Sequence, residues 1–135
     1  MPFLLDTDSC IALLNRRSPS LRDRLLAHPA SEFAISAITA AELVFGAEKS
    51  AKREENLARV ATLRSEIRTE PFDEISIATC GAVRADLERR GVPIGPLDTL
   101  IAAHALALEA VLVTSNLREF RRVRGLRCED WSRSR

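Results

Sequence analysis

The chain has 135 residues, of which 46% are hydrophobic and 29% are charged, and its formal net charge is +1. These values predict one ordinary globular domain that buries roughly two-thirds of its unfolded surface without disulfides. The three cysteines are widely separated and lack metal-ligand spacing, which is typical of a reducing compartment. No apolar run approaches the ~20 residues of a membrane-spanning helix, and residues 3–5 are too few for a signal peptide. We therefore expect a soluble, cytoplasmic protein.

Short apolar runs alternate with helical patterns along the whole chain. Strands are predicted at residues 3–5, 33–36, 69–72, 111–114 and 126–128. Helices are predicted at residues 9–14, 21–26, 53–67, 74–90 and 99–108, with another beginning at residue 39 and a short helical turn at 117–120. This alternation predicts an α/β fold of three layers, α/β/α, with a central parallel sheet of four to five strands. No linker or repeat divides residues 1–135, so we expect a single domain.

Asp98 stands where a loop rich in proline and glycine meets an apolar helix. Pro93 and Pro96 disfavour helix before this point, and the run that begins at Thr99 contains no helix breaker. One interpretation is that Asp98 is an N-cap whose carboxylate accepts backbone N–H bonds. The alternative is that Asp98 belongs to a functional site, and other acids in the chain favour this alternative.

Three further polar residues stand at similar boundaries. Asp6 and Asn116 follow predicted strands, and Glu42 opens a helix, where its spacing from Thr39 also fits a capping box. Ligand sites of open parallel sheets lie beyond the carboxyl ends of the strands, so these residues and Asp98 could converge there. Carboxylates without lysine, histidine or cysteine are typical ligands of Mg²⁺ or Mn²⁺. Such an ion activates water for hydrolysis of a phosphodiester.

Four segments together resemble the PIN-domain ribonucleases of the VapC toxin family. They read FLLDTDSCI, SAITAAELVFGAEKS, GVPIGPLDTLIAAHALAL and LVTSNLREFRRVRGL. The resemblance implies a single PIN domain in which Asp6, Glu42 and Asp98 bind a divalent metal, Mg²⁺ or Mn²⁺. It places Asn116 where many PIN domains have a fourth acid. Two departures are Asp8, a second carboxylate that could join the site or cap the first helix, and Ser115, which replaces a frequent Asn; Thr114 is a further accessory candidate.

The same resemblance implies a type II toxin–antitoxin pair, with a homodimeric toxin whose site is occupied by a VapB-like antitoxin. The subgroup with the greatest similarity cuts the anticodon loop of initiator tRNA, so a tRNA is the expected substrate. Splayed single-stranded loops suit such a site. From residue 118 onward the chain has seven arginines and three acids, a local excess of four positive charges. Arg118, Arg121 and Arg122 could contact RNA phosphates, or the segment could simply be solvated.

Two other function classes remain open at this level. The Asp6-Thr7-Asp8 start also resembles haloacid-dehalogenase-type phosphatases, in which the first Asp is a nucleophile. Such enzymes need a later lysine, and the last lysine here is Lys52. A non-catalytic binding module on the same scaffold would lack Mg²⁺-dependent cleavage. Phe45 and Phe120 are expected in the core, Trp131 is a candidate for base stacking, and His104 is expected to be a packed helix residue.

Overall fold

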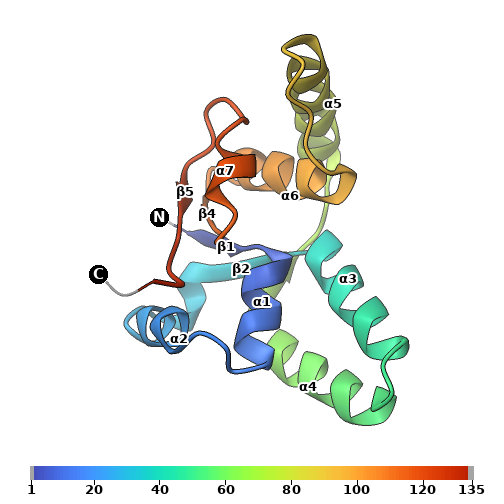
Figure 1. Ribbon diagram of the computed structural model, residues 1–135, viewed down its shortest axis with the longest axis vertical. Helices are drawn as coiled ribbons and strands as arrows, with labels where there is room; N and C mark the ends of the chain where they lie inside the picture. Colours follow the sequence, from blue (N-terminus) through green and yellow to red (C-terminus); the bar gives the residue numbers. More distant parts are fainter. Residues whose placement is uncertain (1, 134–135) are drawn as a thin grey trace.

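A central sheet of five parallel strands organises the molecule, as seen in a computed structural model that describes residues 2–133 (Figure 1). The strands are β1 (Phe3–Leu5), β2 (Phe33–Ser36), β3 (Arg68–Glu70), β4 (Val111–Val113) and β5 (Cys128–Glu129). Their order is β3-β2-β1-β4-β5, and each neighbouring pair is parallel. β1 is therefore the central strand. β2 and β3 are added on one side of it, and β4 and β5 on the other, so the strand order reverses between β1 and β4.

Helices cover both faces of this sheet. They are α1 (Thr7–Leu14), α2 (Pro19–Leu26), α3 (Ala37–Glu48), α4 (Arg53–Glu66), α5 (Glu74–Arg89), α6 (Pro96–Ala107) and α7 (Leu117–Phe120), with a 3₁₀ turn at Ala30–Glu32. α1 to α4 lie on one face and α5 to α7 on the other (Figure 1). The predicted three-layer fold is confirmed. Within residues 2–133, none of the helices has the length and apolar character needed to cross a bilayer.

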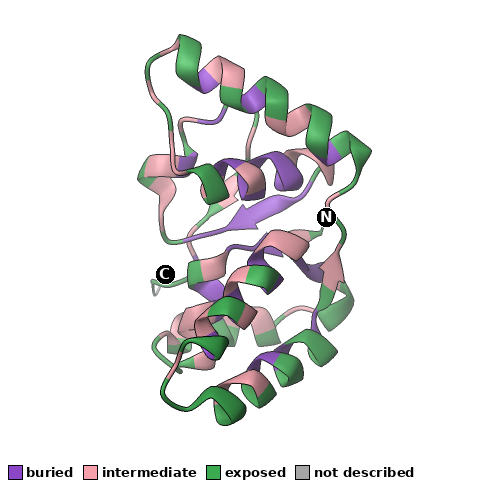
Figure 2. Ribbon diagram, turned by 90° about the vertical axis from the view of Figure 1, so that its right-hand side faces the viewer, coloured by how far each residue is buried: buried purple, intermediate pink, exposed green. Residues whose placement is uncertain are grey.

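The alternation of side chains along the strands creates two cores. Leu5, Ile35 and Val113 are buried against the layer of α1 to α4, whereas Leu4 and Leu112 are buried under α5 to α7. Successive side chains of a strand point to opposite faces, so one short strand contributes to both cores. Figure 2 shows this as buried strands between amphipathic helices. Each fully buried leucine contributes about 1.5–3 kcal/mol of transfer free energy.

α1 and α3 each begin a few residues before their predicted starts, because a different residue caps each helix. α1 begins at Thr7 because Asp6 is its N-cap, so Asp8 lies inside the first turn and is not a cap. α3 begins at Ala37 because Ser36 is its N-cap, so the capping box predicted at Thr39 is absent. Asp73 caps α5 through the Ser76 N–H, as its position before the helical pattern indicates.

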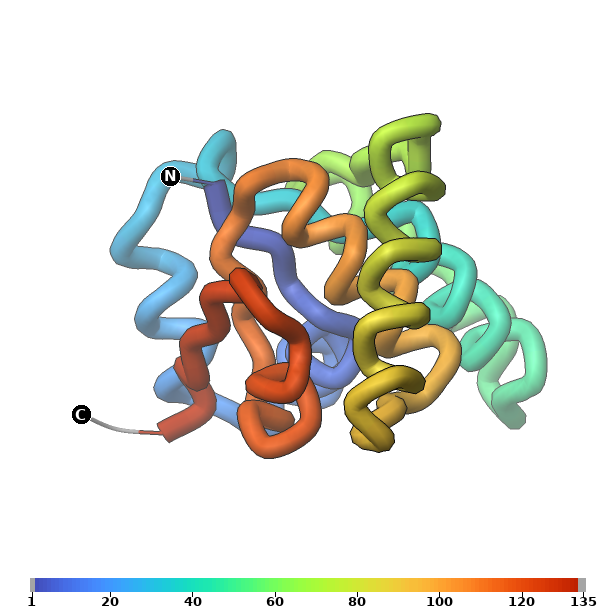
Figure 3. The backbone as a smooth tube through the Cα atoms, turned by 90° about the horizontal axis from the view of Figure 1, so that it is seen from above, coloured from blue at the N-terminus to red at the C-terminus, as the bar shows by residue number. Residues whose placement is uncertain are grey.

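α6 begins two residues before Asp98, with Pro96 in its first turn and Gly95 as N-cap residue. The N-cap interpretation of Asp98 is therefore wrong, because its carboxylate is displaced into the helix. Proline suits this position since its missing N–H would have no partner in a first turn. α6 packs beside α5, as the orange and yellow parts of the tube show (Figure 3). The Asp98 side chain thus needs a role other than capping.

The aromatic side chains differ from expectation in two places. Phe120 is buried as predicted, but Phe45 is 63% exposed on α3. Trp131 is buried and stacks on His28 with ring centroids 5.5 Å apart, which fastens the C-terminal segment beside α2. Trp131 therefore offers no free face to an RNA base. The error arises because a tryptophan near a chain end gives no local sign of what it packs against.

Candidate active site

The candidate site lies beyond the carboxyl ends of β1 and β4, at the point where the strand order reverses. Asp6 follows β1 and Thr114 follows β4, and the Asp6 N–H donates to the Val113 carbonyl at 3.1 Å. This is the crevice where open parallel sheets bind ligands. Asp6 is 3% exposed, and its Oδ1 accepts the Ser9 N–H at 2.8 Å. Burial raises the pKa of Asp6, and hydrogen bonds with Ser9 and Thr114 oppose that rise.

Asp98 lies in the first turn of α6 and faces other acids. The pKa of Asp98 is raised to about 7, first by burial and then by the negative charge of Glu119 and a hydrogen bond between these two carboxyl groups. The charges of Asp6 and Asp8 raise the pKa further. The carboxyl groups of four acids are therefore close enough to affect the ionisation of Asp98 or to be affected by it: Asp6, Asp8, Asp98 and Glu119. Crowding of this kind disfavours the ionised state unless a cation is bound.

Glu119 is a site residue that our sequence analysis missed. Its Oε1 accepts the Gly95 N–H at 2.9 Å, and its Oε2 accepts from the Asn116 amide at 2.6 Å. The Gly95 N–H lowers the pKa of Glu119, so the proton shared by this pair resides on Asp98. The available signal was an acid within an arginine-rich segment, three residues after Asn116 on a predicted helical turn. Asn116 itself acts here by orienting Glu119.

The residues after β4 have separate roles. Thr114 is fully buried, and its hydroxyl accepts the Asn116 N–H at 2.9 Å while also contacting Asp6. Ser115 is exposed. Thr114 thus links Asp6 at the end of β1 to Asn116 after β4. The structure gives Ser115 no comparable connection.

Glu42 lies at the same edge of the sheet and is held by Thr7. The Thr7 hydroxyl donates to Glu42 Oε1 at 2.8 Å and lies 3.1 Å from the Thr39 hydroxyl. Thr7 is the first residue of α1 and directly follows Asp6, so this bond ties α3 to the end of β1. Thr7 was not among the predicted site residues, because a threonine between two aspartates gives no local sign of a partner 35 residues away.

The donor set fits a hard divalent cation, because it consists of carboxylate, hydroxyl and amide oxygens. Within residues 2–133, no three His, Cys, Asp or Glu side chains already converge on one point as metal ligands would. Asp98 is instead bonded to Glu119, and Glu42 to Thr7. The four residues predicted to converge thus share one edge of the sheet, with Glu42 in a separate hydrogen-bonded group. A cation would compete with the proton held by Asp98.

The three arginines selected as RNA contacts are not equivalent. Arg118 and Arg121 are exposed. Arg122 is partly buried and donates to the Pro93 carbonyl at 2.9 Å, which holds the loop that presents Gly95 to Glu119. Arg90 adds a bond of 2.6 Å to the Arg122 carbonyl. Arg122 therefore has a local structural role, and Arg118 and Arg121 are the side chains available to phosphates.

The fold and the cluster of acids define a nuclease-like site, and comparison with known proteins identifies the class. The PIN domain model matches residues 3–126. A tRNA(fMet)-specific endonuclease VapC of Shigella flexneri is 42% identical over 132 residues, which are 98% of this chain and 99% of that protein. Ribonuclease VapC2 of Rickettsia felis is 37% identical over 98% of this chain and all of that protein.

A solved structure agrees with these relatives. The toxin chain in the crystal structure of DNA-bound VapBC from Salmonella typhimurium is similar with a TM-score of 0.92 and 42% identity, over 97% of this chain and 98% of that chain. The chain therefore belongs to the VapC family of PIN-domain ribonucleases. PIN-domain nucleases use divalent metal ions as a class, in agreement with the donor set described above.

Proposed function

We propose that this protein is a Mg²⁺-dependent endoribonuclease toxin that hydrolyses a phosphodiester bond of a tRNA, with the anticodon loop of initiator tRNA as its target. The observation that carries the proposal is the crowding of Asp98 with Glu119, Asp6 and Asp8 at the sheet edge; burial and then these neighbouring acids raise the pKa of Asp98 to about 7. The choice of tRNA rests on the names of two relatives, both tRNA(fMet)-specific endonucleases that are 42% identical over nearly their full length. The anticodon loop rests on the family resemblance of the sequence. Mn²⁺ is expected to replace Mg²⁺, since both prefer oxygen ligands.

Each residue of the proposed site has a separate role in the reaction. Asp6 and Asp98, with Glu42 and Glu119 beside them, would hold the cation, which supplies an activated water and stabilises charge on the phosphorus oxygens. Thr7 orients Glu42, while Gly95 and Asn116 orient Glu119. Asp98 would release its proton to the solvent on cation binding, since only its ionised carboxylate is a good ligand. Arg118 and Arg121 on the surface attract the RNA backbone.

A cleavage assay with purified toxin and a pool of total tRNA tests this function. We expect one tRNA species to be cut in its anticodon loop when Mg²⁺ is present and no cleavage in excess EDTA. The chelator should leave the fold intact, because the oxygen ligands are not needed to build either core. Cleavage that continues in EDTA would refute the metal mechanism, and even cutting of all tRNAs would refute the proposed target.

A phosphatase function is disfavoured by the position of the last lysine. Lys52 is the N-cap residue of α4, beyond the far end of α3. α3 begins near the site, and its twelve residues extend roughly 18 Å away from it. A lysine so placed cannot assist a nucleophilic Asp6. The full-length similarity to ribonucleases favours the same conclusion.

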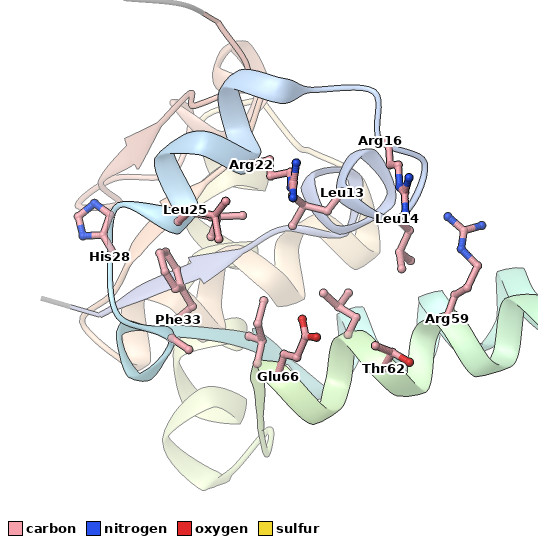
Figure 4. Close-up of a pocket in the computed structure, with 14 residues that line it drawn as sticks. Leu13, Leu14, Arg16, Arg22, Leu25, His28, Phe33, Arg59, Thr62 and Glu66 are labelled. Carbon is pink, nitrogen blue, oxygen red and sulfur yellow. The ribbon is translucent and has the colours of Figure 1, made fainter.

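We also infer that the toxin binds a VapB-like antitoxin, with the toxin present as a homodimer in the complex. Solved relatives are VapBC complexes. A groove of about 720 Å³ lies between α1, α2 and α4 (Figure 4), lined among others by Leu13, Leu14, Leu25, Leu26, Phe33 and Leu63. Arg16, Arg22 and Arg59 are exposed at its rim. These features suit an antitoxin helix with one apolar face and acidic flanks.

Leu26→Asp tests the groove, because Leu26 is 71% exposed and a charge there does not enter the core. We expect antitoxin affinity to fall by roughly tenfold or more, since the aspartate removes an apolar contact and repels acidic flanks. Co-expressed antitoxin should then fail to protect growth, while RNA cleavage is unchanged. Ala61→Asp, on the exposed face of α4 outside the groove, is the matched control.

Equal protection against the Leu26→Asp and Ala61→Asp toxins would place the antitoxin elsewhere. Light scattering of the purified complex gives its mass. One toxin copy per complex would contradict the homodimer.

A further inference from the structure

His104 is a fully buried polar side chain on α6, and the proposed chemistry makes no use of it. Both His104 and Ser36 are 0% exposed, and His104 Nδ1 lies 2.7 Å from the Ser36 hydroxyl. The ring of Phe72 packs edge-on against the imidazole with centroids 5.2 Å apart. Burial lowers the pKa of His104, with Asp73, Glu70 and the Pro71 carbonyl in partial opposition, so the ring is neutral near pH 7.

The hydrogen bonds of Ser36 define the direction of this contact. The Ser36 hydroxyl oxygen accepts the Ile38 N–H at 3.0 Å and so caps α3. Its own proton can donate to His104 Nδ1, and the Pro71 carbonyl beside the ring favours the tautomer with the hydrogen on Nε2. His104 on α6 is therefore bonded to the residue at which α3 begins.

Stability alone does not account for a histidine here. The Pro71 carbonyl attracts the imidazole, but within residues 2–133 His104 Nε2 is one of the buried side-chain atoms without a hydrogen bond of good geometry. A buried polar atom that is poorly paired costs free energy, and an apolar side chain of similar size would avoid that cost. The bond between Nδ1 and Ser36 is the polar contact that a histidine adds to this part of the core.

The two helices joined by this bond carry two of the proposed metal ligands. Asp98 is on α6, and Glu42 is on α3. Each lies six residues from the bonded pair, which is roughly 9 Å along a helix axis. A small rotation of α6 against α3 would change the distance between the two carboxylates. A polar bond at one fixed point resists such a rotation better than apolar packing, which tolerates sliding.

We propose that His104 is a positioning residue that sets the spacing between Glu42 and Asp98 through its hydrogen bond to Ser36. This inference rests on the proposed function, since it concerns the same metal-binding carboxylates. His104 does not contact the reacting groups. Its removal should therefore alter metal affinity and cleavage without lowering the stability of the metal-free fold.

Two substitutions of His104 separate positioning from packing. His104→Leu fills the space but has no polar atom, whereas His104→Asn keeps a polar atom near the position of Nδ1 and leaves a cavity. We expect the leucine variant to melt close to the wild-type temperature, because loss of the poorly paired Nε2 offsets loss of the partner of Ser36. It should need about tenfold more Mg²⁺ for half of its thermal shift and for half-maximal cleavage. The asparagine variant should melt lower but keep the wild-type Mg²⁺ midpoint within about twofold.

Ser36→Gly provides a second approach if a His104 variant fails to fold. Glycine keeps most of the N-cap stability but removes the hydroxyl that His104 binds. We expect the same rise in Mg²⁺ midpoint as in His104→Leu, with no further rise in the double variant, because both changes remove one bond.

The outcomes distinguish the two proposals. A wild-type protein with no Mg²⁺-dependent thermal shift or cleavage would refute the proposed function. A wild type that responds to Mg²⁺, together with unchanged midpoints in His104→Leu and Ser36→Gly, would refute only the positioning role. The positioning role would also be overturned if the Mg²⁺ midpoint rose as the melting temperature fell, with the largest rise in His104→Asn. That result would indicate that His104 has only a structural role.

Discussion

Asp98→Asn is expected to reduce Mg²⁺-dependent RNA cleavage by at least about a hundredfold. Loss of a side chain that binds the metal directly should have a larger effect than loss of one that only orients a ligand. The metal-free variant should be as stable as the wild type or more stable. Asparagine has nearly the same shape but no charge, and it removes the repulsion among Asp98, Glu119, Asp6 and Asp8. Cleavage of the target tRNA and thermal melting in EDTA measure the two effects. Greater stability with lost function is a pattern that a helix-capping aspartate would not give.

Asp73→Asn is the matched control for this experiment. Asp73 is a true N-cap on the helix before the site, where it accepts the Ser76 N–H at 3.1 Å. Asparagine caps almost as well as aspartate, so both cleavage and stability should change little. Full cleavage by Asp98→Asn, or an equal loss in Asp73→Asn, would remove Asp98 from the site.

Glu119→Gln is expected to move the pH dependence of cleavage. In the wild type the pKa of Asp98 is raised to about 7, first by burial and then by Glu119, whose negative charge and hydrogen bond favour protonated Asp98. Cation binding needs ionised Asp98, so at subsaturating Mg²⁺ cleavage should rise as the pH increases through 7. Removal of the Glu119 charge lowers the pKa of Asp98, and the midpoint should move about one unit or more toward lower pH. The maximal rate should fall as well, because a carboxylate beside the cation is lost.

Stability of the metal-free protein should show the opposite trend with pH. The pKa of Asp98 in the folded state lies above its unfolded value of roughly 3.9, so between about pH 4 and pH 7 the folded state binds more protons. The free energy of unfolding therefore decreases as pH rises through this window. Glu119→Gln should weaken that decrease. A pH midpoint of cleavage and a stability profile that both equal those of the wild type would show that Glu119 does not interact with Asp98.

Much of the architecture could be predicted because the determining signals are local. Apolar runs such as Val111–Val113 give strands, and Asp73 and Gly91 delimit α5. The parallel arrangement follows from alternation of strands and helices, and it places strand ends, including Asp6, at one edge. Helix starts were less accurate, because serine, threonine and aspartate near one boundary compete for the same cap. At α3, Ser36 takes that role three residues before the predicted Thr39.

The side-chain network of the site could not be read in the same way. Thr7 with Glu42, Gly95 with Glu119, and Ser36 with His104 are separated by 35, 24 and 68 residues, so only the folded chain brings them together. Asn116 was the predicted fourth polar residue of the site. The structure shows that the Asn116 amide holds the acid Glu119, which lies against Asp98. The sequence pattern thus predicted at which edge of the sheet the polar residues lie. It did not predict that the carboxyl groups of Asp98 and Glu119 pair there.

Calorimetric titration of the metal-free protein with Mn²⁺ tests the central claim most directly, because it measures the carboxylate site without relying on the identity of the RNA. Wild type and Asp73→Asn should bind Mn²⁺ in a saturable isotherm with the same midpoint. Asp98→Asn should show binding weakened by at least about tenfold. Indistinguishable isotherms for all three proteins, or no binding by the wild type, would contradict a metal site built on Asp98.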